Sequence, residues 1–426
     1  MAPQICIFED DHVSQFLPLV HFRPVYALRC GIFSLKEKIV RAYPRANTAI
    51  QCRKSLAGCI KLRKPQFSVN EIPAAECLFI NGRVLADQSL AKKIPLTSKQ
   101  DIVYVSNGQV LAAYVGGANL DRIKKNLSSP LSLSNFIGLP QIEIELETVS
   151  YPWDLIQKNG AQIVKDFQSI AQKAGKKRSH IRGKMLPGVH VLGKKNIIIE
   201  HGAVIYPGTV LDAESGPIYI GKNVKIFPQS TIIGPTCILD GASVKAGAQI
   251  YENTTIGPVC KVGGELEGSI IHSYSNKQHA GFLGHSYLGS WVNLGAGTNN
   301  SDLKNNYSSV KVQVGTEQID TGLSFVGLIM GDHSKTAIGT SLNTGTVIGV
   351  CCNIFGIGFP PKYIPSFSWC GAHEPFSTYH IEKAISVARL VMARRNIGLT
   401  DIEAELFREV YSSTSEERRL HGIQES

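Results

Sequence analysis

Hydrophobic residues recur every six positions through the middle of the chain. Between residues 220 and 262 each sixth residue is aliphatic: Ile220, Ile226, Ile232, Ile238, Val244, Ile250, Ile256 and Val262. The residue four places after each one is mostly small, as at Ser230 and Thr236. A helix repeats every 3.6 residues and a strand every 2, so neither explains a period of six. A triangular prism does, because each six-residue side turns one aliphatic side chain inward and needs a small residue at its corner. The pattern predicts a left-handed parallel β-helix of hexapeptide repeats.

The six-residue period extends in both directions and is broken in places. Further positions that carry it are Ile198, Val204, Val210, Phe282, Leu288, Leu294, Leu342, Ile348 and Ile354. An insertion of four residues shifts the phase before Ile220. The phase is lost between Thr298 and Gly322, which predicts an arm that leaves the prism. We expect the prolines at 360, 361 and 365 to end the β-helix.

The regions on either side of the β-helix show ordinary helix and strand periods. Residues 1–174 predict a mixed α/β domain of the nucleotidyltransferase kind, with strands at 5–8, 76–80, 102–105 and 141–146, a helix at 34–41 and a linker helix at 153–173. The β-helix is assigned to residues 185–372. Residues 373–426 predict a helical cap over the end of the prism and a tail, in which Thr400 to Glu403 form a capping box.

Composition and charge favour a cytoplasmic protein without nucleic-acid or membrane partners. The ten cysteines include no C-x-x-C pair or zinc-type spacing, so reduced thiols are expected. Residues 1–8 carry no secretory signal, and no window approaches eighteen apolar residues. The net charge of +10 arises partly from a basic run at 173–184, which a solvated linker explains. Anionic small substrates such as nucleotides and coenzyme A suit this charge better than nucleic acid.

Candidate chemistry lies where the repeat is interrupted, at residues 275–284. This stretch gathers Asn, Lys, Gln and His just before the coil resumes at Phe282, which is poor for structure and suited to a site. Acetyl transfer to an amine needs a base that works near neutral pH, and histidine supplies one, here His279. Backbone N–H groups of Gly281 or of residues 295–297 are candidates to bind the oxyanion. The alternative, that His279 caps a turn, remains open on the residues alone.

The same stretch resembles a known family of acetyltransferases. His279, Phe282, Leu283-Gly284 and the run VNLGAGT at 292–298 resemble the acetyltransferase half of the bifunctional N-acetylglucosamine-1-phosphate uridyltransferase/glucosamine-1-phosphate acetyltransferase. The resemblance implies His279 as the general base and Asn293 as a substrate contact. The other candidate substrate-binding residues are Lys277, Phe282, Asn300 and Asp302. Phe282 replaces the family's tyrosine, and Asp302 falls where the family has asparagine, so the acceptor sugar is left open.

A second resemblance covers nearly the whole chain. Its motifs are FEDD at 8–11, LPL at 17–19, RPV at 23–25, INGRV at 80–84, YPWD at 151–154, SNK at 275–277, GDHSK at 331–335 and NTGT at 343–346. With these the chain is similar to the alternative, shorter bacterial form of the same bifunctional protein. The resemblance implies an N-acetyltransferase acting on an amino-sugar phosphate, with acetyl-CoA, UTP or a UDP-sugar, and Mg²⁺, in UDP-amino-sugar synthesis.

The nucleotidyltransferase half departs from the long enzymes at its phosphate loop. Their Gly-x-Gly-Thr-Arg-Met run is missing, and basic residues stand in its place. The candidate nucleotide-binding residues are Arg23, Arg29, Lys38 and Arg83, and the candidate metal ligands are Asp11 and Asp154. Two interpretations stay open here: a diverged phosphate cradle, or the surviving framework of an inactive domain.

Two rival functions and an assembly state complete the expectations. A zinc lyase of the γ-carbonic-anhydrase type also uses this prism, and His272, His279 and His285 raise it, although their spacings of seven and six do not match the required pair five apart. A non-catalytic sugar-nucleotide-binding or assembly subunit is the other alternative. We expect a homotrimer, because flat prism faces stack and a neighbouring chain can complete a site on one face.

Overall fold

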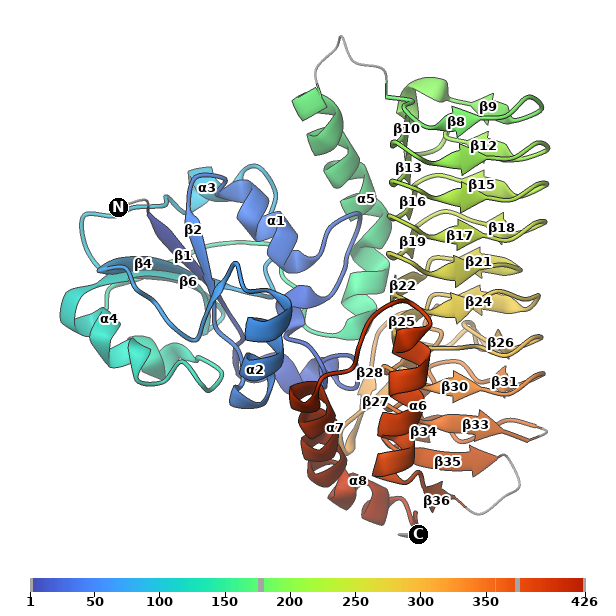
Figure 1. Ribbon diagram of the computed structural model, residues 1–426. Helices are drawn as coiled ribbons and strands as arrows, with labels where there is room; N and C mark the ends of the chain where they lie inside the picture. The colour runs from blue at the N-terminus through green and yellow to red at the C-terminus, as the bar shows by residue number, and fades with distance from the viewer. Residues whose placement is uncertain (1–2, 175–179, 357, 372–375, 424–426) are drawn as a thin grey trace.

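The computed structural model describes residues 3–174, 180–356, 358–371 and 376–423. Figure 1 shows an α/β domain on one side, a tall stack of coils on the other, and helix α5 (Pro152–Ala174) between them. Three C-terminal helices cross the side of the last coils. Within the described residues, no helix combines the length and apolar character that crossing a membrane requires.

The α/β domain is built on a mixed seven-stranded sheet in the order β3-β2-β1-β4-β6-β5-β7. Its strands are β1 (Gln4–Phe8), β2 (Asn47–Ile50), β3 (Ser68–Val69), β4 (Glu76–Asn81), β5 (Ile102–Ser106), β6 (Gln109–Gly116) and β7 (Gln141–Glu143). Its helices are α1 (Leu35–Ala42), α2 (Lys54–Arg63), α3 (Leu90–Lys93) and α4 (Gly117–Lys124), with short 3₁₀ turns at Asp11–Phe16, Val25–Ala27 and Leu133–Phe136. The predicted strands are present, but the last one ends at Glu143 instead of residue 146.

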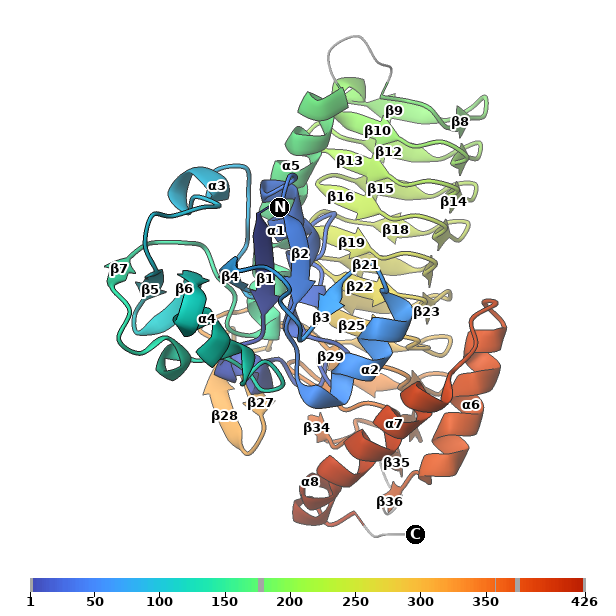
Figure 2. The same ribbon diagram turned by 60° about the vertical axis from the view of Figure 1, so that its left-hand side comes forward.

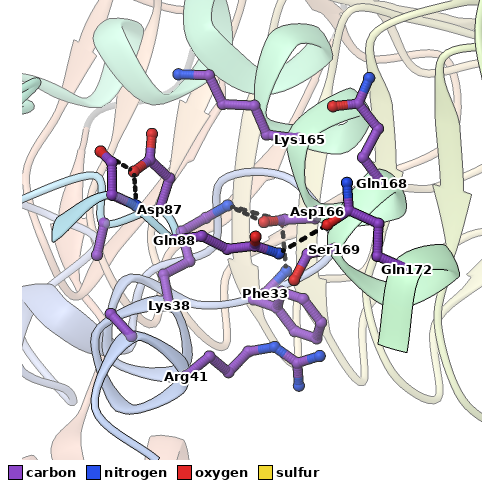
Figure 3. Close-up of a pocket in the computed structure, with 13 residues that line it drawn as sticks. Phe33, Lys38, Arg41, Asp87, Gln88, Lys165, Asp166, Gln168, Ser169 and Gln172 are labelled. Carbon is purple, nitrogen blue, oxygen red and sulfur yellow. Dashed lines mark hydrogen bonds and ion pairs between the residues drawn. The ribbon is translucent and has the colours of Figure 1, made fainter. Parts of the chain in front are cut away.

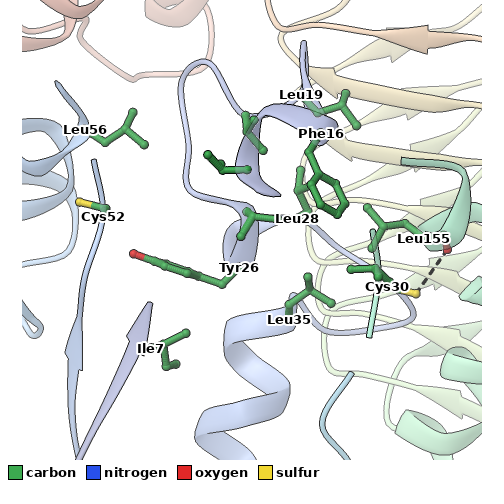
Figure 4. Close-up of a cluster of buried hydrophobic side chains, with 14 of the residues drawn as sticks. Ile7, Phe16, Leu19, Tyr26, Leu28, Cys30, Leu35, Cys52, Leu56 and Leu155 are labelled. Carbon is green, nitrogen blue, oxygen red and sulfur yellow. Dashed lines mark hydrogen bonds between the residues drawn. The ribbon is translucent and has the colours of Figure 1, made fainter. Parts of the chain in front are cut away.

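The core of this domain continues into helix α5. Figure 4 shows Ile7 of β1, Tyr26, Leu28 and Leu35 packed together, with Leu155 of α5 joining them. The thiol of Cys30 donates to the Leu155 carbonyl at 3.3 Å. All ten cysteines are buried and free. Helix α5 is therefore an integral part of the α/β domain and more than a linker.

The second part is a prism with three faces, each built mainly of parallel strands, as the six-residue period predicts. The face toward α5 contains β10 (Ile197–Ile199), β13 (Ile218–Ile220), β16 (Thr236–Ile238), β19 (Thr254–Ile256), β22 (Ile270–Ser273), β25 (Tyr287–Ser290), β29 (Ile329–Met330), β32 (Val347–Ile348) and β34 (Tyr363–Ile364). Within it Ile220 pairs with Ile238 and Ile238 with Ile256, each 18 residues on, which is three sides of six. The inward aliphatic residues are fully buried. The left-handed β-helix is confirmed.

The other two faces follow the same register. One contains β8 (Lys184–Met185), β11 (Val204–Ile205), β14 (Lys225–Ile226), β17 (Ser243–Val244), β20 (Lys261–Val262), β23 (Asn276–Lys277), β30 (Lys335–Thr336), β33 (Asn353–Phe355), β35 (Ser368–Gly371) and the antiparallel β36 (Ser377–Thr378). The other contains β9 (His190–Leu192), β12 (Val210–Asp212), β15 (Thr231–Ile233), β18 (Gln249–Ile250), β21 (Glu265–Glu267), β24 (Phe282–Gly284), β26 (Asn299–Asn300) and β31 (Ser341–Leu342). A 3₁₀ turn at Lys194–Asn196 joins β9 to β10.

Two details of the prism differ from the sequence expectations. The arm starts later than Thr298, because β26 still pairs with β31; the excursion itself is an antiparallel hairpin of β27 (Lys311–Val314) and β28 (Glu317–Asp320). The expectation that the prolines end the β-helix is wrong, since β34 and β35 add another coil. Pro360 and Pro361 precede β34 and Pro365 follows it, so none removes a hydrogen bond from within a strand.

The C-terminal helices join the prism to the α/β domain. They are α6 (Ile381–Ala393), α7 (Asp401–Ser413) and α8 (Ser415–Leu420), and Thr400 forms the predicted capping box with Glu403. They lie along the side of the last coils (Figures 1 and 2), and α7 contacts α2. Phe407 of α7 stacks on Phe22 with 4.5 Å between ring centroids. The expected role as an end cap is therefore replaced by a bridge between the two large parts.

Helix α5 approaches the prism closely at one polar residue. The Asn159 side chain donates to the Asn253 carbonyl at 2.7 Å and accepts from the Gly31 N–H at 2.7 Å. A Cβ at Gly160 would overlap the Asn253 side-chain amide, so a larger residue there would displace that side chain. These contacts fix the α/β domain on the face that contains β16 and β19.

Candidate functional site

His279 lies on the turn between β23 and β24, at a corner of the prism. Strand β24 is on the part of the prism away from the α/β domain (Figure 1). The His279 side chain is exposed, and within the described chain it forms no hydrogen bond or ion pair. A histidine that capped its own turn would bond to it, so the turn-capping alternative finds no support in the contacts.

The backbone around His279 is held from both neighbouring coils. The ammonium group of Lys277 donates to the His279 carbonyl at 2.7 Å and to the Gly263 carbonyl at 3.1 Å. On the other side, the Gly297 N–H donates to the Ala280 carbonyl at 3.0 Å. Burial lowers the pKa of Lys277 to about 8. Lys277, expected to bind substrate, therefore positions the His279 turn.

The other predicted substrate residues divide into two groups beside this corner. The backbone of Asn293 forms parallel β-bridges with Asn276 and Lys335 on one face. Its side-chain oxygen accepts a hydrogen bond from the Asn276 side chain at 3.4 Å. On the next face Asn300 is buried, accepts from the Gly284 N–H at 3.0 Å and donates to the Gly284 carbonyl at 3.0 Å. The Asn300 side chain therefore links two neighbouring coils through Gly284. Asn293 stays half-exposed and can reach a ligand.

Phe282 and Asp302 meet over Gly284. His285 lies beside them and pairs with Asp302, a pairing that the sequence analysis did not predict. A Cβ at Gly284 would overlap the Asp302 carboxylate and the Phe282 ring, so a larger residue there would displace both side chains. Nδ1 of His285 lies 2.8 Å from the Asp302 carboxylate. Residues about 18 positions apart lie on neighbouring coils and stack on each other. His285 and Asp302 are 17 positions apart, so their spacing in the sequence could have predicted the pair.

The three histidines of the zinc-lyase alternative do not meet within one chain. His272 is half-buried, with Nδ1 near two serine hydroxyls and Nε2 3.1 Å from the Ala27 carbonyl. His285 pairs with Asp302, and His279 is exposed. Within the described ranges, the group able to hold a metal is Asp10, Asp11 and His12.

That acidic group follows β1, where the strand order reverses direction between β1 and β4. Such a switch point is the usual ligand site of an open α/β sheet. Nδ1 of His12 lies 3.0 Å from the Asp11 carboxylate and 3.5 Å from that of Asp10. A small cavity of about 180 Å³ opens beside them, lined also by Gln109 and Ser132.

Two residues predicted for this region have structural partners instead. Arg83 is fully buried and donates to Asp10 through Nη2 at 2.6 Å and to the Val149 carbonyl at 2.8 Å. Asp154 accepts from the backbone N–H groups of Ser150 and Tyr151, which fixes the start of α5. Asp11 is therefore grouped with Asp10 and His12 instead of Asp154.

Lys38 is also engaged, in the wall of a cavity of about 300 Å³ between α1 and α5. Figure 3 shows its ammonium group pointing at Asp166, at 2.6 Å and 2.7 Å from the two carboxylate oxygens. Gln162 accepts a further hydrogen bond from it at 2.9 Å. With 1% of its side chain exposed, Lys38 ties α1 to α5 and offers no surface to a nucleotide.

Neither Arg23 nor Arg29 contacts the Asp10–His12 group: the Arg23 side chain bonds to the prism, and the Arg29 side chain bonds within its own domain. Nη1 of Arg23 donates to Asp332 at 2.8 Å, and Nη2 donates to Ser290 at 3.0 Å. Nη1 of Arg29 donates to the Ile32 carbonyl at 3.1 Å and lies 3.5 Å from the Glu37 carboxylate. Both line a cavity that shares no residue with the one beside Asp10.

Comparison with known proteins identifies the N-terminal part. Residues 5–174 match the family of sugar nucleotidyl transferases. This part of the chain belongs to the sugar nucleotidyltransferase family. The chain is 27% identical over 248 residues to the bifunctional sugar-1-phosphate nucleotidylyltransferase/acetyltransferase of Sulfurisphaera tokodaii, covering 55% of this chain and 53% of that protein. It is 29% identical over 201 residues to the bifunctional protein GlmU of Methanococcus aeolicus, covering 47% and 41%.

These are distant relationships, and the chain spans about half or less of the length of these relatives. Among solved structures, the UDP-N-acetylglucosamine acyltransferase of Francisella novicida is similar at 13% identity, with a TM-score of 0.32, over 56% of this chain and 88% of that one. The comparisons thus relate this chain to sugar nucleotidyltransferases and to bifunctional proteins that combine a nucleotidylyltransferase with an acetyltransferase.

Proposed function

We propose that the protein transfers the acetyl group of acetyl-CoA to the amine of an amino-sugar phosphate similar to glucosamine 1-phosphate, with His279 as the general base. The observation that carries the proposal is an unbonded, exposed histidine on a turn that both adjacent coils hold in place. The bifunctional names of the distant relatives agree with the class of reaction.

The proposed chemistry uses groups at the prism corner. The amine nitrogen of the sugar attacks the thioester carbonyl while His279 takes a proton from that amine. The C–N bond forms and the C–S bond breaks. The coenzyme A thiolate that leaves then receives the proton from His279. Of the candidate oxyanion donors, the N–H groups of Gly295 and Gly297 already donate to Thr336 and Ala280. The N–H groups of Gly281 and Ala296 make no hydrogen bond within the described chain, so they are our candidates to bind the oxyanion. Asn293 is the candidate contact to the sugar.

We assign the N-terminal domain to nucleotide binding with a divalent cation at Asp10, Asp11 and His12. Asp11 is the more available carboxylate for Mg²⁺, because 63% of its side chain is exposed, whereas Asp10 already accepts from Arg83 and Asn81. Bound there, the cation would neutralise phosphate charge. All four predicted nucleotide contacts are held in ion pairs. That observation favours a second candidate for this half, a sugar-nucleotide-binding framework without turnover.

Incubation with acetyl-CoA and single amino-sugar phosphates tests the proposal. We expect one amino-sugar 1-phosphate to gain an acetyl group, detected by mass, with release of free coenzyme A thiol. Addition of UTP and Mg²⁺ then separates the two candidates for the N-terminal half, because only an active domain yields a UDP-linked product. The absence of acetylation on every amino-sugar phosphate offered would contradict the proposal.

We further propose a homotrimer, because His279 is exposed in a single chain and needs a second wall to enclose substrate. The nine-stranded face is covered by α5 and the α/β domain (Figures 1 and 2), so the neighbouring chain would pack on the other faces. Sedimentation should give about three times the chain mass of 46.3 kDa. A stable monomer at micromolar concentration would rule out a shared site.

A further inference from the structure

A cavity of about 440 Å³ lies where the three parts of the chain meet. The α/β domain contributes Arg29, Arg63 and Lys64 to its wall, the prism contributes Trp291 and His333, and helix α7 contributes Phe407. None of these residues belongs to the His279 corner or to the Asp10–His12 group. Its volume falls within the usual range of small-molecule sites.

One wall is a column of flat rings produced by the stacking of successive coils. Tyr274 and Trp291 stack with centroids 4.3 Å apart and planes 11° from parallel. Trp291 and His333 continue the column at 6.0 Å and 21°. These three residues have positive φ angles of 57°, 63° and 61°, so each occupies the same kind of turn. Such a column offers a surface for an aromatic ring.

The rim beside this column is basic. Four cationic side chains line the cavity, Arg23, Arg29, Arg63 and Lys64, against the carboxylates of Asp332 and Glu403. Arg23 pairs with Asp332 and Arg63 pairs with Glu403. Lys64 is exposed and has no ion-pair partner in the described part of the chain. Arg29 lies 3.5 Å from the Glu37 carboxylate, which is outside the cavity lining, so Lys64 is the cation left over for an anionic ligand.

Two buried polar atoms of the wall lack partners. Nε of Arg29 and Nδ1 of His333 are inaccessible and form no hydrogen bond with described residues. His333 is 6% exposed, and burial lowers its pKa well below the ordinary value. Both atoms belong to side chains that line the cavity, so the polar groups of its wall are not fully paired within the described chain.

We propose that this cavity binds a nucleotide, with its base against the Tyr274–Trp291–His333 column and its phosphates toward Arg29, Arg63 and Lys64. The site is separate from the acetyl transfer proposed at His279 and needs no metal. The lining includes Arg23 and Arg29, which the sequence analysis expected to bind a nucleotide within the α/β domain. Here they line a cavity that this domain shares with the prism and the C-terminal helices. Bound ligand would therefore hold the three parts together.

Titration of tryptophan fluorescence with ATP and with UTP, in the presence of EDTA, tests the proposal. We expect saturable quenching from Trp291, and at least about tenfold weaker binding of pyrophosphate and of the free nucleosides, since each offers half of the contacts. Lys64→Glu should weaken nucleotide binding about tenfold, because it reverses a charge at the phosphates. Its matched control is Lys54→Glu at the other end of α2, which is exposed and outside the cavity and should bind as the unmodified protein does.

A second pair of variants separates this site from the proposed active sites. Asp11→Asn and His279→Ala should leave the EDTA-resistant binding unchanged. Binding that disappears with EDTA or with Asp11→Asn would place the nucleotide beside Asp10 and overturn the proposal. So would equal losses in Lys64→Glu and Lys54→Glu, or no binding of either nucleotide at millimolar concentration by calorimetry.

Discussion

Replacement of His279 by alanine should lower acetyl transfer by about 10²–10⁴-fold while the melting temperature and oligomeric state stay nearly unchanged. The expected loss is that of a general base. Stability should be preserved because the exposed side chain makes no hydrogen bond, whereas the turn is fixed by Lys277 and Gly297 through its backbone. Steady-state rates with saturating acetyl-CoA, combined with thermal unfolding, measure both quantities.

His285→Ala and His272→Ala are the matched controls for this experiment. His285 bonds to Asp302 and packs against Phe325, and His272 bonds to two prism serines and to the Ala27 carbonyl. Both changes should lower the melting temperature more than the rate. If His279→Ala retains near-normal turnover, or loses it only by unfolding, His279 is not the base and His285 becomes the candidate.

Lys38→Met should destabilise the α/β domain by about 3–5 kcal/mol, because it leaves the buried Asp166 carboxylate without its cation. Asp166 also accepts from the N–H groups of Ile32 and Phe33. The double variant Lys38→Met/Asp166→Asn removes both charges and keeps an acceptor for those groups, so it should be more stable than Lys38→Met alone. Urea unfolding followed by circular dichroism measures the difference.

Lys165→Met is the control on α5 for the Lys38 experiment. Lys165 pairs with Glu147 at the surface, and such pairs contribute about 1 kcal/mol or less. A Lys38→Met protein with unaltered stability and impaired nucleotide binding would instead restore Lys38 to the nucleotide site that the sequence suggested.

The fold was largely predictable because its signal is local. An inward aliphatic residue at every sixth position is imposed by each side of the prism on its own, so the period could be counted without knowing any partner. The boundaries were less predictable. Strand β26 continues the prism although the aliphatic phase is lost, because its pairing with β31 depends on a coil 42 residues further on.

The charged residues were the least predictable part of the candidate site. Arg23 and Asp332 are 309 residues apart, and Lys38 and Asp166 are 128 apart. No local pattern gives such partners, so basic residues near a strand end looked available for phosphate. Within the prism the situation is different, since residues about 18 apart lie on neighbouring coils. That rule, applied to His285, would have led to Asp302.

The long-range contacts of the α/β domain also set an order of events during synthesis. The domain leaves the ribosome first, and the prism can add coils one at a time, because each coil contacts its neighbours. Arg23 meets Asp332 only after a further 309 residues have been made, roughly 15–60 s at usual elongation rates. Arg63 meets Glu403 later still. The nascent α/β domain therefore presents its unpaired arginines until the last coils and α7 have emerged.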